Sequence, residues 1–178
     1  MKQPTRILAL ILAFATIISC TKTKLEGIYN RQENQIDTYV SKYEGDHRIV
    51  YRGGSSRIIM TEGQGDSLSV NGYVSFYYAG YTFSGNVSNA NMFITNHKET
   101  AERAGWNLTD ADYGLYEIKM SDAELLPGLK EGLIGVKAGE ECEILFSGKY
   151  GIGSKPFGII PANSALLYKI WDITVSNE

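Results

Sequence analysis

The sequence predicts an α+β fold in which antiparallel strands wrap around one short helix. Short runs of alternating or β-branched residues recur along most of the chain, separated by glycine-containing turns. The 178 residues include 19 glycines and 12 tyrosines, a composition that favours strands over helices. Among the strands, residues 127–136 begin with a proline and carry leucines on one side, as a short helix does. A chain of this length favours one domain with short attachments.

Residues 1–19 are expected to be a targeting segment. Lys2 and Arg6 precede an apolar run, residues 7–18, that is too short to cross a bilayer as a helix. The run ends in IISC, which resembles the lipobox of bacterial lipoproteins, where the cysteine becomes the acylated N-terminus. The resemblance implies lipid attachment at Cys20 and membrane anchoring in the cell envelope. Because no aspartate follows Cys20, it favours the outer membrane, facing the periplasm. An ordinary cleaved signal peptide is the alternative.

The net charge and the number of cysteines limit which partners the protein can bind and which disulfides it can form. The net charge is −3, and no cluster of Lys and Arg occurs, so a nucleic-acid partner is not expected. Without the two basic residues of the leader, 15 basic residues stand against 20 acidic ones, a net charge of −5. If Cys20 carries lipid, Cys142 is the remaining thiol and no intrachain disulfide forms. The alternating segment ECEILF predicts that Cys142 is a buried strand residue.

Residues 20–45 are predicted to form a tether and a short N-terminal helix. Apolar residues recur there roughly at helical spacing, from Leu25 through Ile36 to Tyr43. We expect this helix to pack on its own domain, and a homodimer formed through it is the alternative. Residues 48–60 then form a hairpin around a Gly-Gly-Ser-Ser turn.

Further strands are expected at 72–80, 115–120 and 141–146 and within 156–173. Residues 84–114 are polar, with little periodicity, and exceed the usual length of a loop in a compact domain, so we expect a functional flap or an insertion there. The histidines His47 and His97 are isolated, and GIGSKPFG opens no helix as a phosphate loop would. No metal site and no cofactor are therefore expected.

Five motifs, in order, resemble those of FKBP-type peptidyl-prolyl isomerases. They are NGYVSFYYAG (71–80), MFITN (92–96), ELLPGLKEGLIGVKAGEECEILF (124–146), KYGIG (149–153) and GIIPANSALLYKI (158–170). The resemblance covers a core of residues 63–175 and implies an FKBP-like domain at residues 46–178. It also implies cis-trans isomerisation of proline-containing segments of client proteins, in this setting during the folding of envelope proteins.

The resemblance implies a peptide pocket, position by position. Residues that match the family's catalytic positions are Tyr78, Phe93, Tyr150, Ile160 and Tyr168. Residues that match its substrate-binding positions are Tyr116, Leu125, Leu126 and Leu129. The Leu126 N–H and the Tyr150 hydroxyl would reach the substrate, and Ile160 would cover it, which accounts for an apolar pair at 159–160 in a loop. For Tyr116 and Tyr168, which lie in strands, core packing is the competing interpretation.

Two departures from the family pattern bear on activity. Ile94 stands where the family has an aspartate, and residues 94–115 form a longer segment than compact members have. The isomerase that we expect could therefore have reduced activity. The second interpretation is an FKBP-fold lipoprotein that binds peptides or proteins with little or no turnover, and the third is an unrelated β-rich lipoprotein.

Overall fold

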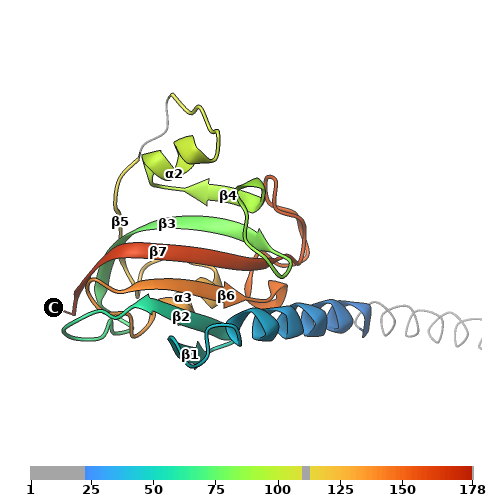
Figure 1. Ribbon diagram of the computed structural model, residues 1–178, viewed down its shortest axis with the longest axis horizontal. Helices are drawn as coiled ribbons and strands as arrows, with labels where there is room; N and C mark the ends of the chain where they lie inside the picture. Colours follow the sequence, from blue (N-terminus) through green and yellow to red (C-terminus); the bar gives the residue numbers. More distant parts are fainter. Residues whose placement is uncertain (1–22, 110–112, 178) are drawn as a thin grey trace, which may run out of the picture.

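The computed structural model describes residues 23–109 and 113–177 (Figure 1). The chain begins with a helix described over 23–40, which we call the N-terminal helix. The later elements, in order, are β1 (Arg48–Arg52), β2 (Ser55–Thr61), β3 (Tyr73–Phe83), η1 (Asn89–Asn91), β4 (Met92–Thr95), α2 (Lys98–Arg103), β5 (Tyr116–Lys119), α3 (Pro127–Leu133), β6 (Glu141–Phe146), η2 (Gly148–Tyr150) and β7 (Ala165–Ser176). The predicted α+β class, with a sheet around one short helix and an N-terminal helix and hairpin, is confirmed.

All strands belong to one antiparallel sheet that does not close into a barrel. Its order is β1-β2-β6-β7-β3-β4, and β5 pairs with β3 beside β4. The predicted hairpin extends this sheet, because β2 pairs with β6 along its length. The segment 84–114 contains β4 and α2, which its weak periodicity did not predict. Within the described ranges, no helix is both long enough and apolar enough to cross a membrane.

Both faces of the sheet carry apolar side chains. Neighbouring residues on the central strands point to opposite faces, and in these strands both neighbours are apolar. In β6, Ile144 and Phe146 belong to one buried cluster and Leu145 to another, and in β7 Leu166 and Leu167 divide in the same way. The short helix α3 covers the first face and the N-terminal helix covers the second. The residues that make these contacts are Leu129 and Leu133 of α3 and Ile36, Tyr39 and Val40 of the N-terminal helix.

A carboxylate lies within the second cluster. Glu143 is only 5% exposed. Tyr39 Oη donates a hydrogen bond of 2.8 Å to Glu143 Oε2, and Lys169 Nζ lies 2.9 Å from Glu143 Oε1. A buried carboxylate is tolerated when it is paired and hydrogen-bonded in this way. The same contacts connect the N-terminal helix to β6 and β7.

The helix α3 lies against β6 through two glycines. A Cβ atom on Gly128 would overlap the Phe146 ring, and one on Gly132 would overlap the Ile144 side chain. Glycine in a helix interior costs about 1 kcal/mol relative to alanine. These two glycines are therefore explained by the close approach of the helix to the strand.

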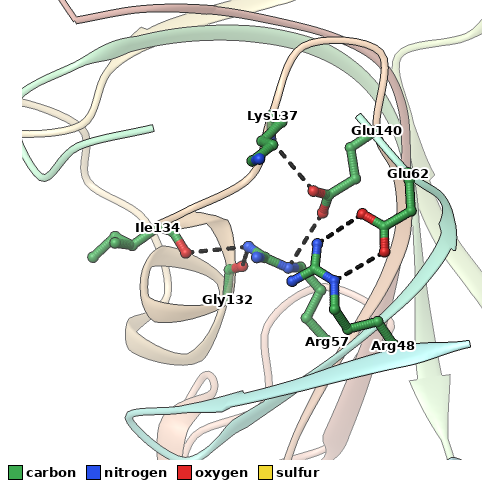
Figure 2. Close-up of polar contacts among 7 residues, drawn as sticks. All are labelled: Arg48, Arg57, Glu62, Gly132, Ile134, Lys137 and Glu140. Carbon is green, nitrogen blue, oxygen red and sulfur yellow. Dashed lines mark hydrogen bonds and ion pairs between the residues drawn. The ribbon is translucent and has the colours of Figure 1, made fainter. Parts of the chain in front are cut away.

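A buried ion pair holds the other end of α3 (Figure 2). The side chains of Arg57 and Glu140 are 4% and 0% exposed, with 3.3 Å between Nε and Oε1. Arg57 Nη1 donates to the carbonyl oxygens of Gly132 and Ile134 at 2.8 and 3.1 Å, and the Lys137 N–H donates to Glu140 Oε2 at 3.3 Å. Burial raises the pKa of Glu140, against the opposing attraction of Arg57. The pair connects β2, the end of α3 and the turn before β6.

A β-bulge in β7 explains the polar residue near its end. Strict alternation would direct Asp172 into the core. Between two flanking pairs, however, β7 has one residue more than β3, and Asp172 adopts a φ of 52°. The extra residue lets Ile173 point inward, at 2% exposure, while Asp172 stays in solvent.

Substituting Gly128→Ala is expected to lower the free energy of unfolding by about 1–3 kcal/mol, because overpacking against Phe146 outweighs the better helix propensity of alanine. Urea denaturation measures the change. The matched control is Gly27→Ala, a glycine in the N-terminal helix with open space around it, which should be neutral or stabilising. Equal effects of the two substitutions would contradict the close packing.

Substituting Glu140→Gln is expected to destabilise the fold by about 3–5 kcal/mol, because it leaves the Arg57 charge buried without its partner. The neighbouring pair Arg48–Glu62 in Figure 2 provides the control, since both of its side chains are about half exposed. Glu62→Gln should change the denaturation midpoint much less. Similar midpoints for both variants would show that the buried pair has no special weight.

Candidate active site

A two-part hollow lies beside the N-terminal end of α3. Its two lobes adjoin, since Ile94, Leu126 and Tyr168 line both. The flap lobe has a volume of about 260 Å³ and is otherwise lined by Phe93, Ile152, Phe157, Gly158, Ile159 and Ile160. The floor lobe has a volume of about 220 Å³ and is otherwise lined by Phe76, Tyr78, Tyr116, Glu124, Leu125 and Leu129.

The structure brings together eight of the nine residues predicted for the pocket. Those that line one lobe or both are Tyr78, Phe93, Tyr116, Leu125, Leu126, Leu129, Ile160 and Tyr168. Tyr116 is 41% exposed, so core packing does not account for it, whereas Tyr168 is 7% exposed and serves both the core and the pocket wall.

The ninth residue, Tyr150, packs against the same buried cluster as Ile160 and Tyr168 but lines neither lobe. It lines a separate groove of about 430 Å³ between the N-terminal helix and the turn of the β1–β2 hairpin. Gly54, which has no side chain, leaves room for the Tyr150 ring, and a Cβ atom at this position would overlap it. Lys149 Nζ lies 5.3 Å from the ring centroid. Tyr150 is therefore not among the residues that line the two lobes.

The aromatic wall is built around Tyr168. Its ring stacks on Phe146, with centroids 6.1 Å apart, and meets Phe93 edge-on at 5.9 Å and Tyr78 at 6.2 Å. Tyr116 continues the row, 5.9 Å from Tyr78. Such tilted and offset contacts between rings are the favourable ones.

The hydroxyls of Tyr78 and Tyr168, two residues that line the lobes, stay neutral. Burial raises the pKa of Tyr168, and the nearby Tyr78 raises it further. Burial also raises the pKa of Tyr78. Neither hydroxyl has a hydrogen-bonding partner among the described residues, so both are free to donate to a ligand.

Ile94 lies at the boundary of the two lobes, which we call the ridge, because it lines both. Ile94 pairs with Gly80 across β3 and β4, and a Cβ atom on Gly80 would meet Ile94, Phe93 and Tyr168 at 2.8, 2.8 and 3.0 Å. Gly80 therefore gives the pocket wall its room. The only charged side chain that lines either lobe, among the described residues, is Glu124.

The inserted segment leaves the pocket clear. Of its described residues from 95 to 115, none lines either lobe. Asn96 fills the gap in strand pairing between β4 and β5: it accepts a hydrogen bond from the Tyr78 N–H at 2.7 Å and donates to the carbonyl oxygens of Phe76 and Gly114. The side chain thus replaces a strand partner of β3, and the insertion departs without disturbing the wall.

Sequence reasoning missed the rim of the flap lobe. Ile152, Phe157 and Ile159 line it, and Phe157 and Ile159 are 72% and 76% exposed. The signal was present as bulky apolar residues in a glycine- and proline-rich loop. Only the structure shows that Ile160 points inward, at 5% exposure, while its neighbour Ile159 remains at the rim.

The arrangement suits a reaction that depends on the shape of the pocket and on the removal of water from the substrate. Across the described ranges, no group of three or more His, Cys, Asp or Glu side chains could hold a metal ion. Cys142 is buried, and burial raises the pKa of its thiol, so it is not a reactive nucleophile. An apolar, aromatic-lined hollow with a few polar groups is typical of a small-ligand or peptide site.

Comparison with known proteins agrees with this geometry. The family model of the FKBP-type peptidyl-prolyl cis-trans isomerases matches residues 70–171. FK506-binding protein 1 of Aspergillus oryzae is 26% identical over 117 residues, which span 66% of this chain and 94% of that protein.

Solved structures share the fold. The crystal structure of FkpA from Escherichia coli matches with a TM-score of 0.57 at 17% identity, over 98% of this chain and 73% of that one. A peptidyl-prolyl cis-trans isomerase from Pseudomonas syringae pv. tomato matches with a TM-score of 0.56 at 15% identity, over 83% and 95% of the two chains. With the family model covering more than half of its length, the chain belongs to the FKBP-type peptidyl-prolyl cis-trans isomerase family.

Proposed function

We propose that this protein isomerises X–Pro bonds of client proteins in the two-lobed pocket and assists the folding of envelope proteins. Family membership supports isomerase activity. The observation that carries the proposal is the convergence of eight predicted residues on one apolar hollow beside α3.

The reaction requires no proton transfer. Rotation about the X–Pro bond breaks amide resonance, with a barrier of roughly 18–20 kcal/mol, so uncatalysed exchange takes tens to hundreds of seconds. The twisted transition state has lost charge separation across the C–N bond. An apolar pocket therefore disfavours it less than the planar ground state, and this difference in binding is the source of catalysis.

A few donors would orient the peptide. Leu126 immediately precedes α3, and its N–H has no acceptor among the described residues. In our proposal this N–H would bond a substrate carbonyl, because Leu126 lines both lobes. The neutral hydroxyls of Tyr78 and Tyr168 offer further donors.

The proposed location rests on the leader sequence. Residues 1–22 lie outside the described residues, so lipidation of Cys20, outer-membrane anchoring and a periplasmic face remain proposals based on the lipobox. A homodimer through the N-terminal helix would use the exposed side of that helix, which carries Ile28 at 38% exposure, because Ile36, Tyr39 and Val40 are buried on their own domain.

A second candidate function is a binding module with little turnover. It is favoured by two observations at the site: Ile94 occupies the ridge where the family has an aspartate, and Tyr150 lies in a different groove. Such a protein would hold proline-containing segments in the same pocket without accelerating exchange.

The full chain is expected to accelerate cis-trans exchange of an X–Pro peptide, measured by NMR exchange spectroscopy. Ile160→Ala should lower kcat/KM by about ten- to fiftyfold, because it removes three carbons and buried apolar surface is worth about 0.8 kcal/mol per methylene. Val70→Ala, an exposed aliphatic residue outside the lobes, is the control. A folded wild type without activity would exclude the isomerase. An Ile160→Ala variant as active as the control would exclude this pocket.

Restoring a carboxylate at the ridge tests whether turnover is limited there. Ile94→Asp is expected to raise kcat/KM several-fold, because it supplies a charged acceptor in the lobe that the Tyr78 and Tyr168 side chains line. Ile94→Asn has a similar size and no charge and serves as the matched control. If Ile94→Asp were no faster than the wild type, the missing aspartate would not account for any reduced activity.

A further inference from the structure

The loop that covers the flap lobe has both of its ends at one place. We call residues 151–163 the flap; it carries Ile152, Phe157, Ile159 and Ile160 of the lobe. Just before it, Gly148 is buried, and a Cβ atom there would overlap the backbone of Asn163. The two ends of the flap therefore meet in backbone contact, and their position determines where the covering side chains lie.

One side chain of the N-terminal helix holds both ends. Gln32 Nε2 donates a hydrogen bond of 2.7 Å to the Asn163 carbonyl oxygen, and the Gly148 N–H donates one of 2.9 Å to Gln32 Oε1. Tyr29 Oη adds a bond of 2.9 Å to Asn163 Oδ1. Asn163 adopts a φ of 58°, a left-handed conformation that asparagine tolerates better than most residues.

These contacts differ from the packing of the rest of the helix. The apolar anchors of the N-terminal helix are Ile36, Tyr39 and Val40. Tyr29 and Gln32 lie one to two turns earlier, where the helix passes the end of the sheet at which β6 ends and β7 begins (Figure 1). In this region the N-terminal helix contacts the domain through polar groups at the ends of the flap. Next to them, Ser147 Oγ donates a hydrogen bond of 3.2 Å to Glu33 Oε1 of the helix.

We propose that Gln32 and Tyr29 are positioning residues for the isomerase: they clamp the two ends of the flap and so hold Ile152 and Ile160 over the proline pocket. The inference rests on the proposed function for its kinetic consequence. A loop held in its binding conformation has less conformational entropy to lose when a peptide enters. Releasing the clamp should therefore weaken peptide binding more than it slows the bound reaction.

The experiment compares wild type, Gln32→Ala and Gln35→Ala in the full chain. Gln35 lies one turn further along the same helix and makes no hydrogen bond to either flap end among the described residues, so it controls for the loss of a glutamine. Gln32→Ala should raise KM about tenfold, with kcat changed much less. A merely destabilised enzyme would lose active molecules without a change in KM.

Amide hydrogen exchange provides a readout that does not depend on activity. The Ile160 and Asn163 N–H groups donate to Phe157 and Gly153 within the flap, and they should exchange about tenfold faster in Gln32→Ala while the amides of β6 keep their wild-type rates. If the wild type has no isomerase activity, the proposed function fails and exchange alone decides the clamp. Equal flap exchange in the two variants overturns the proposal. Should Gln32→Ala not fold, Tyr29→Phe, which removes one hydroxyl, is judged by the same exchange measurement.

Discussion

Apolar side chains project from both faces of the central strands, and each face must be covered before the sheet can exclude water. The short helix α3 covers one face and the N-terminal helix covers the other. Both functional features follow from this constraint. The pocket opens where α3 begins above the first face, and the flap that roofs one lobe is held from the helix on the second face.

The pocket depends on how firmly α3 is held. Glycines let its backbone approach β6, and Arg57 binds the carbonyl oxygens at its far end. With the helix fixed at both places, Leu126 and Leu129 keep their positions in the floor lobe. Arg57 and Glu140 bear on function only through this support, since neither lines a lobe. Stability and site geometry are thus linked through one short helix.

The pocket has well-defined apolar walls but few polar or charged groups. Its walls are aromatic and aliphatic, its hydroxyls stay neutral, and Ile94 replaces the charge that the family carries at the ridge. Isomerisation at proline needs no acid or base, so this pocket can serve it. In the isomerase that we propose, more of the task of orienting a peptide would then fall to the flap and to the Leu126 N–H, and control of the flap by the N-terminal helix would bear on turnover.

Local patterns in the sequence determined the α+β class, the hairpin and the short helix starting at Pro127, because alternation and turn residues act over a few neighbouring positions. The family motifs, in turn, named eight residues that line the two lobes. Tertiary structure alone decided the rest. The bulge at Asp172 depends on pairing with β3, and the location of Tyr150 depends on the space left by Gly54. The bonds from Gln32 to Gly148 and Asn163 join residues more than a hundred positions apart. Such contacts have no periodic signature in the sequence, since they arise only when distant segments are folded together.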